Sequence, residues 1–169
     1  ARKFIKRNEI QTIPFEDINK VIEKNNGDCV SLIGVLEHLI NPNQAIKSFC
    51  KSRSKYLYIS VPLFSFSSFL EHANPKIFPR HLGGDHTHLY TKESLDYLFK
   101  KNRLKIVGEW WFGTDFADLH RTLSNNFSNK NSNFFQDCFQ KFFSNYINDF
   151  QNILDKNKIC SEVHMVVSK

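Results

Sequence analysis

Long apolar runs are missing from this 169-residue sequence. No stretch approaches the ~20 apolar residues that a helix needs to cross a bilayer. The basic start, ARKFIKRNEI, is not followed by the apolar segment that a signal peptide carries. These absences predict a protein that has no membrane partner.

Cysteine and glycine are also scarce. The cysteines form no C-x-x-C pair and most adjoin apolar residues, which indicates reduced core residues in a cytoplasmic protein. None of the six glycines belongs to a G-x-G between a strand and a helix. The four cysteines are Cys29, Cys50, Cys138 and Cys160.

Positive charge is in modest excess, with a net charge of +6 and a pI of about 9.1. The basic residues are scattered along the chain, so we expect them on the solvated faces of several helices. This pattern argues against nucleic acid as a partner, although the charge alone would allow one. A hydrophobic content of 41% predicts one globular domain over residues 1–169.

A parallel β-α-β unit is the most informative pattern. Asp28–Gly34 and Lys55–Val61 are short runs rich in Val, Ile and Leu, which is typical of buried strands. Between them, Asn41 and Pro42 fit the start of a helix over Pro42–Ser52. Because ligands bind beyond the carboxyl ends of parallel strands, the Glu-His pair at 37–38 is the first place to look for chemistry.

The remaining elements are predicted from periodicity and turn residues. Residues 62–90 form a long irregular segment, which in a compact domain is usually functional. The aromatic residues of 134–154 recur every three or four positions, which predicts one amphipathic helix packed on the sheet. We expect strands at 9–13, 104–110 and 163–167, helices at 16–24, 65–72, 91–102, 115–123 and 134–154, and a polar linker at 125–133.

Four segments taken together resemble the second half of the class I S-adenosylmethionine-dependent methyltransferases. They are DCVSLIGVLEHL (28–39), KYLYISVP (55–62), HTHLYTKESL (86–95) and LKIVGEWWFG (104–113). The resemblance covers roughly residues 9–123. It implies an α/β fold with a mostly parallel, doubly wound, Rossmann-like sheet, helices on both faces and an antiparallel final strand. It also implies S-adenosylmethionine as cofactor. The acceptor is not implied by the resemblance, but the aromatic and His-rich character of residues 62–90 suits a small polar metabolite or sugar better than nucleic acid.

The same resemblance implies residues that contact the cofactor. It places Gly34, Val35, Leu36 and Glu37 beside the methionine and adenosine parts of the cofactor, and Glu16 or Asp17 beside the adenine. Other roles are open: Glu37 could cap or pair within the next helix. The helix dipole explains acidic residues at 16 and 17 equally well.

A histidine-rich stretch, RHLGGDHTH (80–88), lies in the irregular segment. The resemblance places this segment over the acceptor, where His81, His86 or His88 could act as a general base. A loop held by ordinary hydrogen bonds is the second interpretation. A metal site is the third, because the H-x-x-x-D-H-x-H spacing matches no known zinc pattern. We therefore expect no metal, and no structural metal shared by the three histidines.

A third cluster follows the strand at 104–110. Trp111, Asp115 and Arg121 are candidate substrate contacts, since an indole can wall a pocket and a guanidinium can bind phosphate or carboxylate. Neighbouring residues on a strand point to opposite faces, so at least one of Trp110 and Trp111 is expected in the core.

The glycine-rich cofactor loop of that family and its ribose-binding acidic residue have no counterpart in this sequence. We therefore expect the chain to begin partway through the fold, with residues 62–90 as an acceptor-site loop and 125–158 as a C-terminal helical segment. The strand at 28–34 would then expose an edge, which either the strand at 9–13 or a second copy of the chain would cover. Two alternative functions are a non-catalytic interaction module and another nucleotide- or sugar-nucleotide-binding enzyme.

Overall fold

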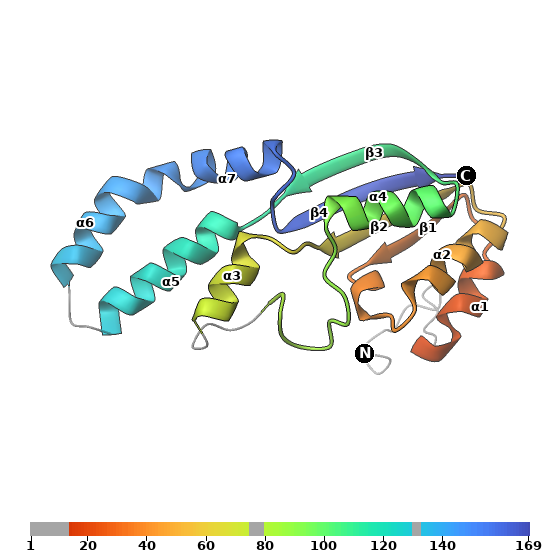
Figure 1. Ribbon diagram of the computed structural model, residues 1–169, viewed down its shortest axis with the longest axis horizontal. Coiled ribbons are helices and arrows are strands. Elements are labelled where there is room, and N and C mark those ends of the chain that lie inside the picture. Colours follow the sequence, from red (N-terminus) through yellow and green to blue (C-terminus); the bar gives the residue numbers. More distant parts are fainter. Residues whose placement is uncertain (1–13, 75–79, 130–132) are drawn as a thin grey trace, which may run out of the picture.

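A four-stranded sheet organises the chain, and the computed structural model describes residues 14–74, 80–129 and 133–169 (Figure 1). The spatial order is β1-β2-β4-β3, in which β1 and β2 are parallel and β4 runs antiparallel to both of its neighbours. The predicted fold class, α/β with mostly parallel strands and an antiparallel final strand, is confirmed. The strands are β1 (Cys29–Ile33), β2 (Tyr56–Pro62), β3 (Lys105–Phe112) and β4 (Glu162–Ser168).

The helices begin at the capping residues that the sequence offers. Asn41 accepts a hydrogen bond from the backbone N–H of Gln44, and Ser65 and Thr91 each form a capping box with the serine three positions on. These caps satisfy N–H groups that the first turn leaves free. The helices are α1 (Ile18–Glu23), α2 (Pro42–Lys51), α3 (Phe66–Ala73), α4 (Lys92–Lys101), α5 (Asp115–Asn129), α6 (Asn133–Phe143) and α7 (Ile147–Lys156), with 3-10 turns η2 (Phe15–Asp17), η3 (Leu36–His38) and η4 (Ser144–Tyr146).

One face of the sheet carries the hydrophobic core. Alternate residues of β2 and β4 point to this face, where α2 and α4 cover them, and Phe49 and Phe99 from those helices are almost fully buried. Burying such side chains is the main favourable contribution to folding. The fully buried strand residues are Leu57, Ile59, Val61, Val163, Met165 and Val167.

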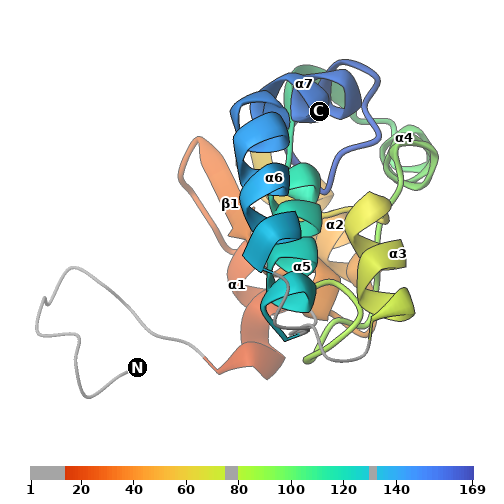
Figure 2. The same cartoon turned by 90° about the vertical axis from the view of Figure 1, so that its left-hand side faces the viewer.

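The opposite face of the sheet is open in the described part of the chain. Ile33 and Trp110 stand on this face and are both 62% exposed, with Ser60 and His164 between them in the same rung. Figure 2 shows α2, α3 and α4 on the same side of β1. Helices on both faces were expected, and over the described ranges they are not seen. Trp111, in contrast, is buried, so one tryptophan of the pair lies in the core as predicted.

The C-terminal helices differ most from expectation. α5 runs on to Asn129, so most of the segment predicted as a polar linker at 125–133 is helical. The single helix expected at 134–154 is instead broken by η4 into α6 and α7. α6 packs beside α5 beyond the end of β3 rather than on the sheet (Figure 1), and Phe134 and Phe142 remain largely exposed. Periodicity identified the helical faces but could not say which surface they meet.

Two further predictions are decided by the structure. Of the four cysteines, which were all expected in the core, Cys160 is buried whereas Cys29 is exposed. In the described ranges, no helix combines the length and the apolar character that crossing a bilayer demands.

β1 lies at the edge of the described sheet, since it pairs with β2 alone there. The strand predicted at 9–13 falls outside the described residues, so its position beside β1 is not tested. The alternative, a second copy of the chain covering this edge, stays a prediction. We expect light scattering of the purified chain to give the mass of a dimer; a monomer at tens of micromolar would contradict this branch.

Candidate functional site

A pocket of about 300 Å³ lies at the carboxyl ends of β1 and β2. Ile33 and Gly34 come from the end of β1, and Ser60 and Pro62 from the end of β2. This is the position at which parallel sheets bind ligands. Its lining is completed by Glu37, Val61, Arg80, His81, His86 and Glu162.

Gly34 shapes the floor of this pocket. Its N–H continues the β ladder by donating to the carbonyl of Ser60 at 3.1 Å. Its φ is +60°, a left-handed conformation that residues with a side chain adopt only with strain. The chain can therefore leave β1 sharply and wind into η3, which carries Glu37 and His38 back over the strand end.

Glu37 is the most unusual polar residue at the site. Its side chain is buried, with 3% of the residue exposed. Its Oε2 atom has no hydrogen-bond partner, and its Oε1 atom lies 3.9 Å from His38 Nε2. A buried carboxylate without donors is costly, so this oxygen is suited to accept a hydrogen bond or a cation from a ligand.

The histidine-rich loop is anchored directly on η3. The N–H groups of Thr87 and His88 and the hydroxyl of Thr87 all donate to the carbonyl of Glu37, at 2.8, 3.2 and 2.9 Å. The hydroxyl of Thr87 also lies 3.0 Å from the carbonyl of Leu39. These hydrogen bonds hold the histidine-rich stretch 80–88 in a defined position beside the pocket, and the role of 62–90 as an acceptor-site loop stays a prediction.

Glu71 of α3 holds the other end of the loop. Its carboxylate accepts hydrogen bonds from the N–H groups of His81 and Leu82 and lies 2.8 Å from His81 Nδ1. Burial alone would raise the pKa of Glu71, but these hydrogen bonds outweigh it and bring the pKa below its usual value. His81 is 2% exposed, so we infer that its ring fixes the loop to α3 at the wall of the pocket.

The three candidate catalytic histidines are thus placed differently. His86 lines the pocket, and its Nδ1 lies 3.1 Å from the carbonyl of His81, which leaves Nε2 for other chemistry. His88 is absent from the pocket lining; its ring lies against Tyr90 and its Nδ1 is 2.8 Å from the hydroxyl of Thr87. Geometry therefore favours His86 as the residue that faces an acceptor.

The candidate cofactor contacts are only partly together. Gly34 and Glu37 line the pocket. Leu36 is instead fully buried in the hydrophobic core, and Val35 packs against that core. Glu16 lies exposed in η2 and is not among the lining residues.

The candidate substrate contacts do not line this pocket. Trp111 is in the core, and the ammonium of Lys158 lies 5.5 Å from its ring centre. Asp115 is fully buried and accepts hydrogen bonds from the hydroxyl of Ser65 and the N–H of Ser67. Arg121 is exposed on α5 and pairs with Asp118 at 3.0 Å. Trp111 and Asp115 thus lie inside the fold and Arg121 forms a surface ion pair, and their contact with a substrate stays a prediction.

Sequence reasoning gave no role to three polar residues beside the pocket. His38 was noted at the strand end but given no role, and its Nδ1 lies 3.0 Å from the carbonyl of Asp85. Glu162 begins β4, and an antiparallel strand starts where its parallel neighbours end, so topology could have pointed to it. Arg80 reaches Thr114 and Asp118 at 2.7 and 3.2 Å, contacts that no local pattern signals.

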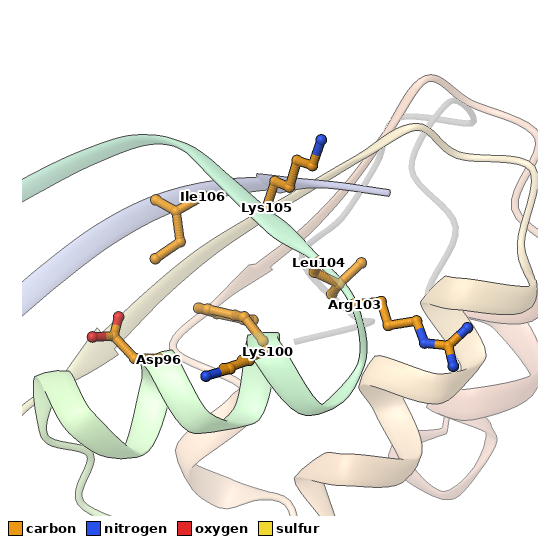
Figure 3. Close-up of a pocket in the computed structure, with 7 residues that line it drawn as sticks. Asp96, Lys100, Arg103, Leu104, Lys105 and Ile106 are labelled. Carbon is orange, nitrogen blue, oxygen red and sulfur yellow. The ribbon is translucent and has the colours of Figure 1, made fainter.

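A second pocket, of about 480 Å³, opens at the other end of β3 (Figure 3). Lys105 begins β3 and pairs with Ser168, which in turn pairs with the first residue of β2. This pocket is therefore at the amino ends of the parallel strands, away from the carboxyl-end site. Its lining is Asp96, Phe99, Lys100, Arg103, Leu104, Lys105 and Ile106.

Comparison with known proteins finds similarity among solved structures alone. No protein-family model matches the chain, and no curated protein matches it. A SAM dependent methyltransferase from Archaeoglobus fulgidus is 15% identical over 97% of this chain and 68% of its own, with a TM-score of 0.49. The small RNA methyltransferase HEN1 is 12% identical over 88% of this chain and 15% of its own, also with a TM-score of 0.49.

A putative sarcosine dimethylglycine methyltransferase from Galdieria sulphuraria is 10% identical over 87% of this chain and 54% of its own, with a TM-score of 0.45. The chain therefore spans between 15% and 68% of the lengths of these three proteins. We base the functional proposal on this chain's own residues.

Proposed function

We propose that this chain supplies the carboxyl-end pocket of an S-adenosylmethionine-dependent methyltransferase whose acceptor is a small polar molecule. The observation that carries the proposal is the pocket itself. It joins the left-handed Gly34, the unpaired carboxylate oxygen of Glu37 and the ring of His86 at the strand ends where the methyltransferase-like motifs predicted a site.

The pocket residues fit parts of this cofactor. Gly34 has no side chain, so its backbone can be approached closely, and Glu37 Oε2 can accept a hydrogen bond from an ammonium or hydroxyl group. When bound, S-adenosylmethionine supplies an electrophilic methyl group on a sulfonium, which is transferred by direct displacement. We assign Gly34 and Glu37 to cofactor contact, and leave Glu16, Val35 and Leu36 as weaker candidates for it.

The chain's own part in the reaction is to position the acceptor and remove its proton. His86 in its neutral form can do this, because Nδ1 donates to a carbonyl and the lone pair on Nε2 is then able to take a proton. The fixed loop holds this ring over the strand ends, which limits the geometries that the acceptor can adopt. His81 supports the loop. The cytoplasmic location expected from the sequence stays a prediction.

Calorimetry with S-adenosylmethionine and S-adenosylhomocysteine tests the proposal on the 169-residue chain. We expect weak binding, with a dissociation constant on the order of 1 mM, because no glycine-rich loop or ribose-binding carboxylate is present in the sequence. A low micromolar constant would show that those elements are not needed and would contradict this account of the site.

The non-catalytic alternative is favoured by one specific observation: the sequence has no glycine-rich cofactor loop. Under that alternative the pocket would serve a protein partner or no ligand. Complete absence of cofactor binding at several millimolar, together with a stable complex of the chain with another protein, would favour it over catalysis.

A further inference from the structure

We propose that Glu37, His38 and His86 form a binding site for a divalent transition-metal ion such as Zn²⁺, Mn²⁺ or Fe²⁺. One potential ligand atom from each residue lies within 4.8 Å of the other two. Glu37 and His38 come from η3, and His86 comes from the loop that is tied to it. The sequence alone led us to expect no metal, and this set, which shares only His86 with the three histidines of the loop, departs from that expectation.

The carboxylate of Glu37 is the first argument for a cation. It is buried, and its Oε2 has no hydrogen-bond partner. Within the described residues, the basic group paired with this carboxylate is the ring of His38, whose Nε2 lies 3.9 Å from Oε1. An uncompensated buried carboxylate is strongly unfavourable, and a metal ion is a partner that removes the penalty.

The orientation of the two imidazoles is the second argument. The Nδ1 atoms of His38 and His86 lie 3.0 and 3.1 Å from the carbonyls of Asp85 and His81. A carbonyl only accepts, so each Nδ1 carries a proton, and in the neutral imidazole the lone pair is then on Nε2. Histidines that bind metals are typically held in this way, with the second ring nitrogen donating to a carbonyl or carboxylate.

The ligands are also held together before any ion binds. The rings of His38 and His86 lie 4.8 Å apart between their centres. The carbonyl that orients His86 belongs to His81, whose backbone and ring are fixed by Glu71. The carbonyl of Glu37 accepts hydrogen bonds from the N–H groups of Thr87 and His88, the two residues that follow His86. Such support lowers the entropy lost when a ligand binds.

The donor set indicates the class of metal. Two imidazoles and one carboxylate suit zinc, iron or manganese better than magnesium or calcium, which prefer all-oxygen sites. Each Zn–N bond is about 2.1 Å, so two ligands of one ion lie at most about 4 Å apart. The ligand atoms must therefore close by roughly 1 Å, which small side-chain rotations provide. Three protein ligands leave at least one position open for water or a polar ligand, as in catalytic rather than structural sites.

This inference does not require the proposed methyl transfer, since metal binding is measured without cofactor or acceptor. Should both hold, Glu37 and His86 would hold the ion instead of contacting the cofactor and taking the acceptor proton, and the ion would lower the pKa of a bound acceptor hydroxyl.

Titration of the purified chain with Co²⁺ and Zn²⁺ tests the site, with visible absorption following Co²⁺ and calorimetry following Zn²⁺. We expect one equivalent of either metal to bind. The variants Glu37→Gln, His38→Ala and His86→Ala should each weaken binding at least about tenfold, whereas His88→Ala, a neighbouring histidine outside the set, should leave it within about twofold. Circular dichroism confirms that each variant is folded.

Nitrogen-detected NMR of the histidine rings gives a second readout that is independent of affinity. In the metal-free chain, His38 and His86 should be Nδ1–H tautomers, and Zn²⁺ should shift their Nε2 resonances alone. The proposal is overturned if the chain binds neither metal at about 1 mM free ion. It is equally overturned if the folded variants bind as tightly as the unmodified chain, or if the resonances that move belong to other histidines.

Discussion

Replacing His86 by Ala should lower the turnover of methyl transfer about 100-fold, the effect typical of losing a positioned general base. Cofactor affinity should change far less, because the proposal assigns cofactor contact to Gly34 and Glu37 and the acceptor to His86. Its ring is held by the carbonyl of His81 and lines the pocket at the strand ends. The measurement is kcat together with the dissociation constant for S-adenosylhomocysteine in the proposed methyltransferase.

The matched control is His88→Ala, two positions further on. From sequence both histidines were equal candidates, but His88 packs against Tyr90 outside the pocket. Its replacement should therefore reduce turnover much less. If neither variant changes kcat, the loop is only a scaffold. If cofactor affinity falls in proportion to turnover in His86→Ala, the residue contacts the cofactor and not the acceptor.

Asp115→Ala should destabilise the fold by about 3 kcal/mol, because it leaves buried hydrogen-bond donors without an acceptor. Asp115 is fully buried and accepts from the Ser65 hydroxyl at 2.6 Å, the Ser67 N–H at 2.9 Å and Gln151 Nε2 at 3.3 Å. These contacts join the start of α3, the start of α5 and α7. Urea unfolding measures the loss, and Asp149→Ala, at an exposed position of α7, should change stability by no more than about 0.5 kcal/mol.

The same carboxylate predicts a pH dependence. Burial alone would raise the pKa of Asp115, but the hydrogen bonds from Ser65, Ser67 and Gln151 lower it below its usual value. The folded state therefore binds this proton less readily than the unfolded state, whose pKa is about 3.9. The stabilising contribution is complete above that pH and is lost as the pH falls through the folded-state pKa.

Comparison of the unmodified chain with Asp115→Asn shows this directly. The stability difference between them should be constant at neutral pH and should shrink below about pH 4. A difference that does not vary with pH would mean that Asp115 keeps an ordinary pKa and that its hydrogen bonds do not favour the charged form.

Local patterns predicted most of the sheet and its helices. The runs at 28–34 and 55–61, the caps at Asn41 and Thr91, and the closing strand all match the structure to within a residue or two. These features depend on nearest neighbours and on alternation, which a sequence displays. The position of the site also followed, because a parallel strand end is fixed once the strands are known.

What could not be predicted depends on contacts between distant segments. Asp115 was expected at a substrate, and no local pattern shows that it lies buried beside Ser65 and Gln151, which are 50 and 36 positions away in the sequence. The aromatic stripe of 134–154 shows a face but not its partner, and α6 meets α5 instead of the sheet. His38 gained significance only when the loop brought His86 beside it.

The most direct test of the central claim is an NMR titration of the isotopically labelled chain with S-adenosylhomocysteine, with adenosine as a control ligand. We predict that the amide resonances of Gly34, Glu37 and His86 move in a saturable way, whereas those of Leu104 and Ile106 in the opposite pocket do not. No movement at several millimolar, or movement confined to the opposite pocket, would contradict a cofactor site at the carboxyl ends of β1 and β2.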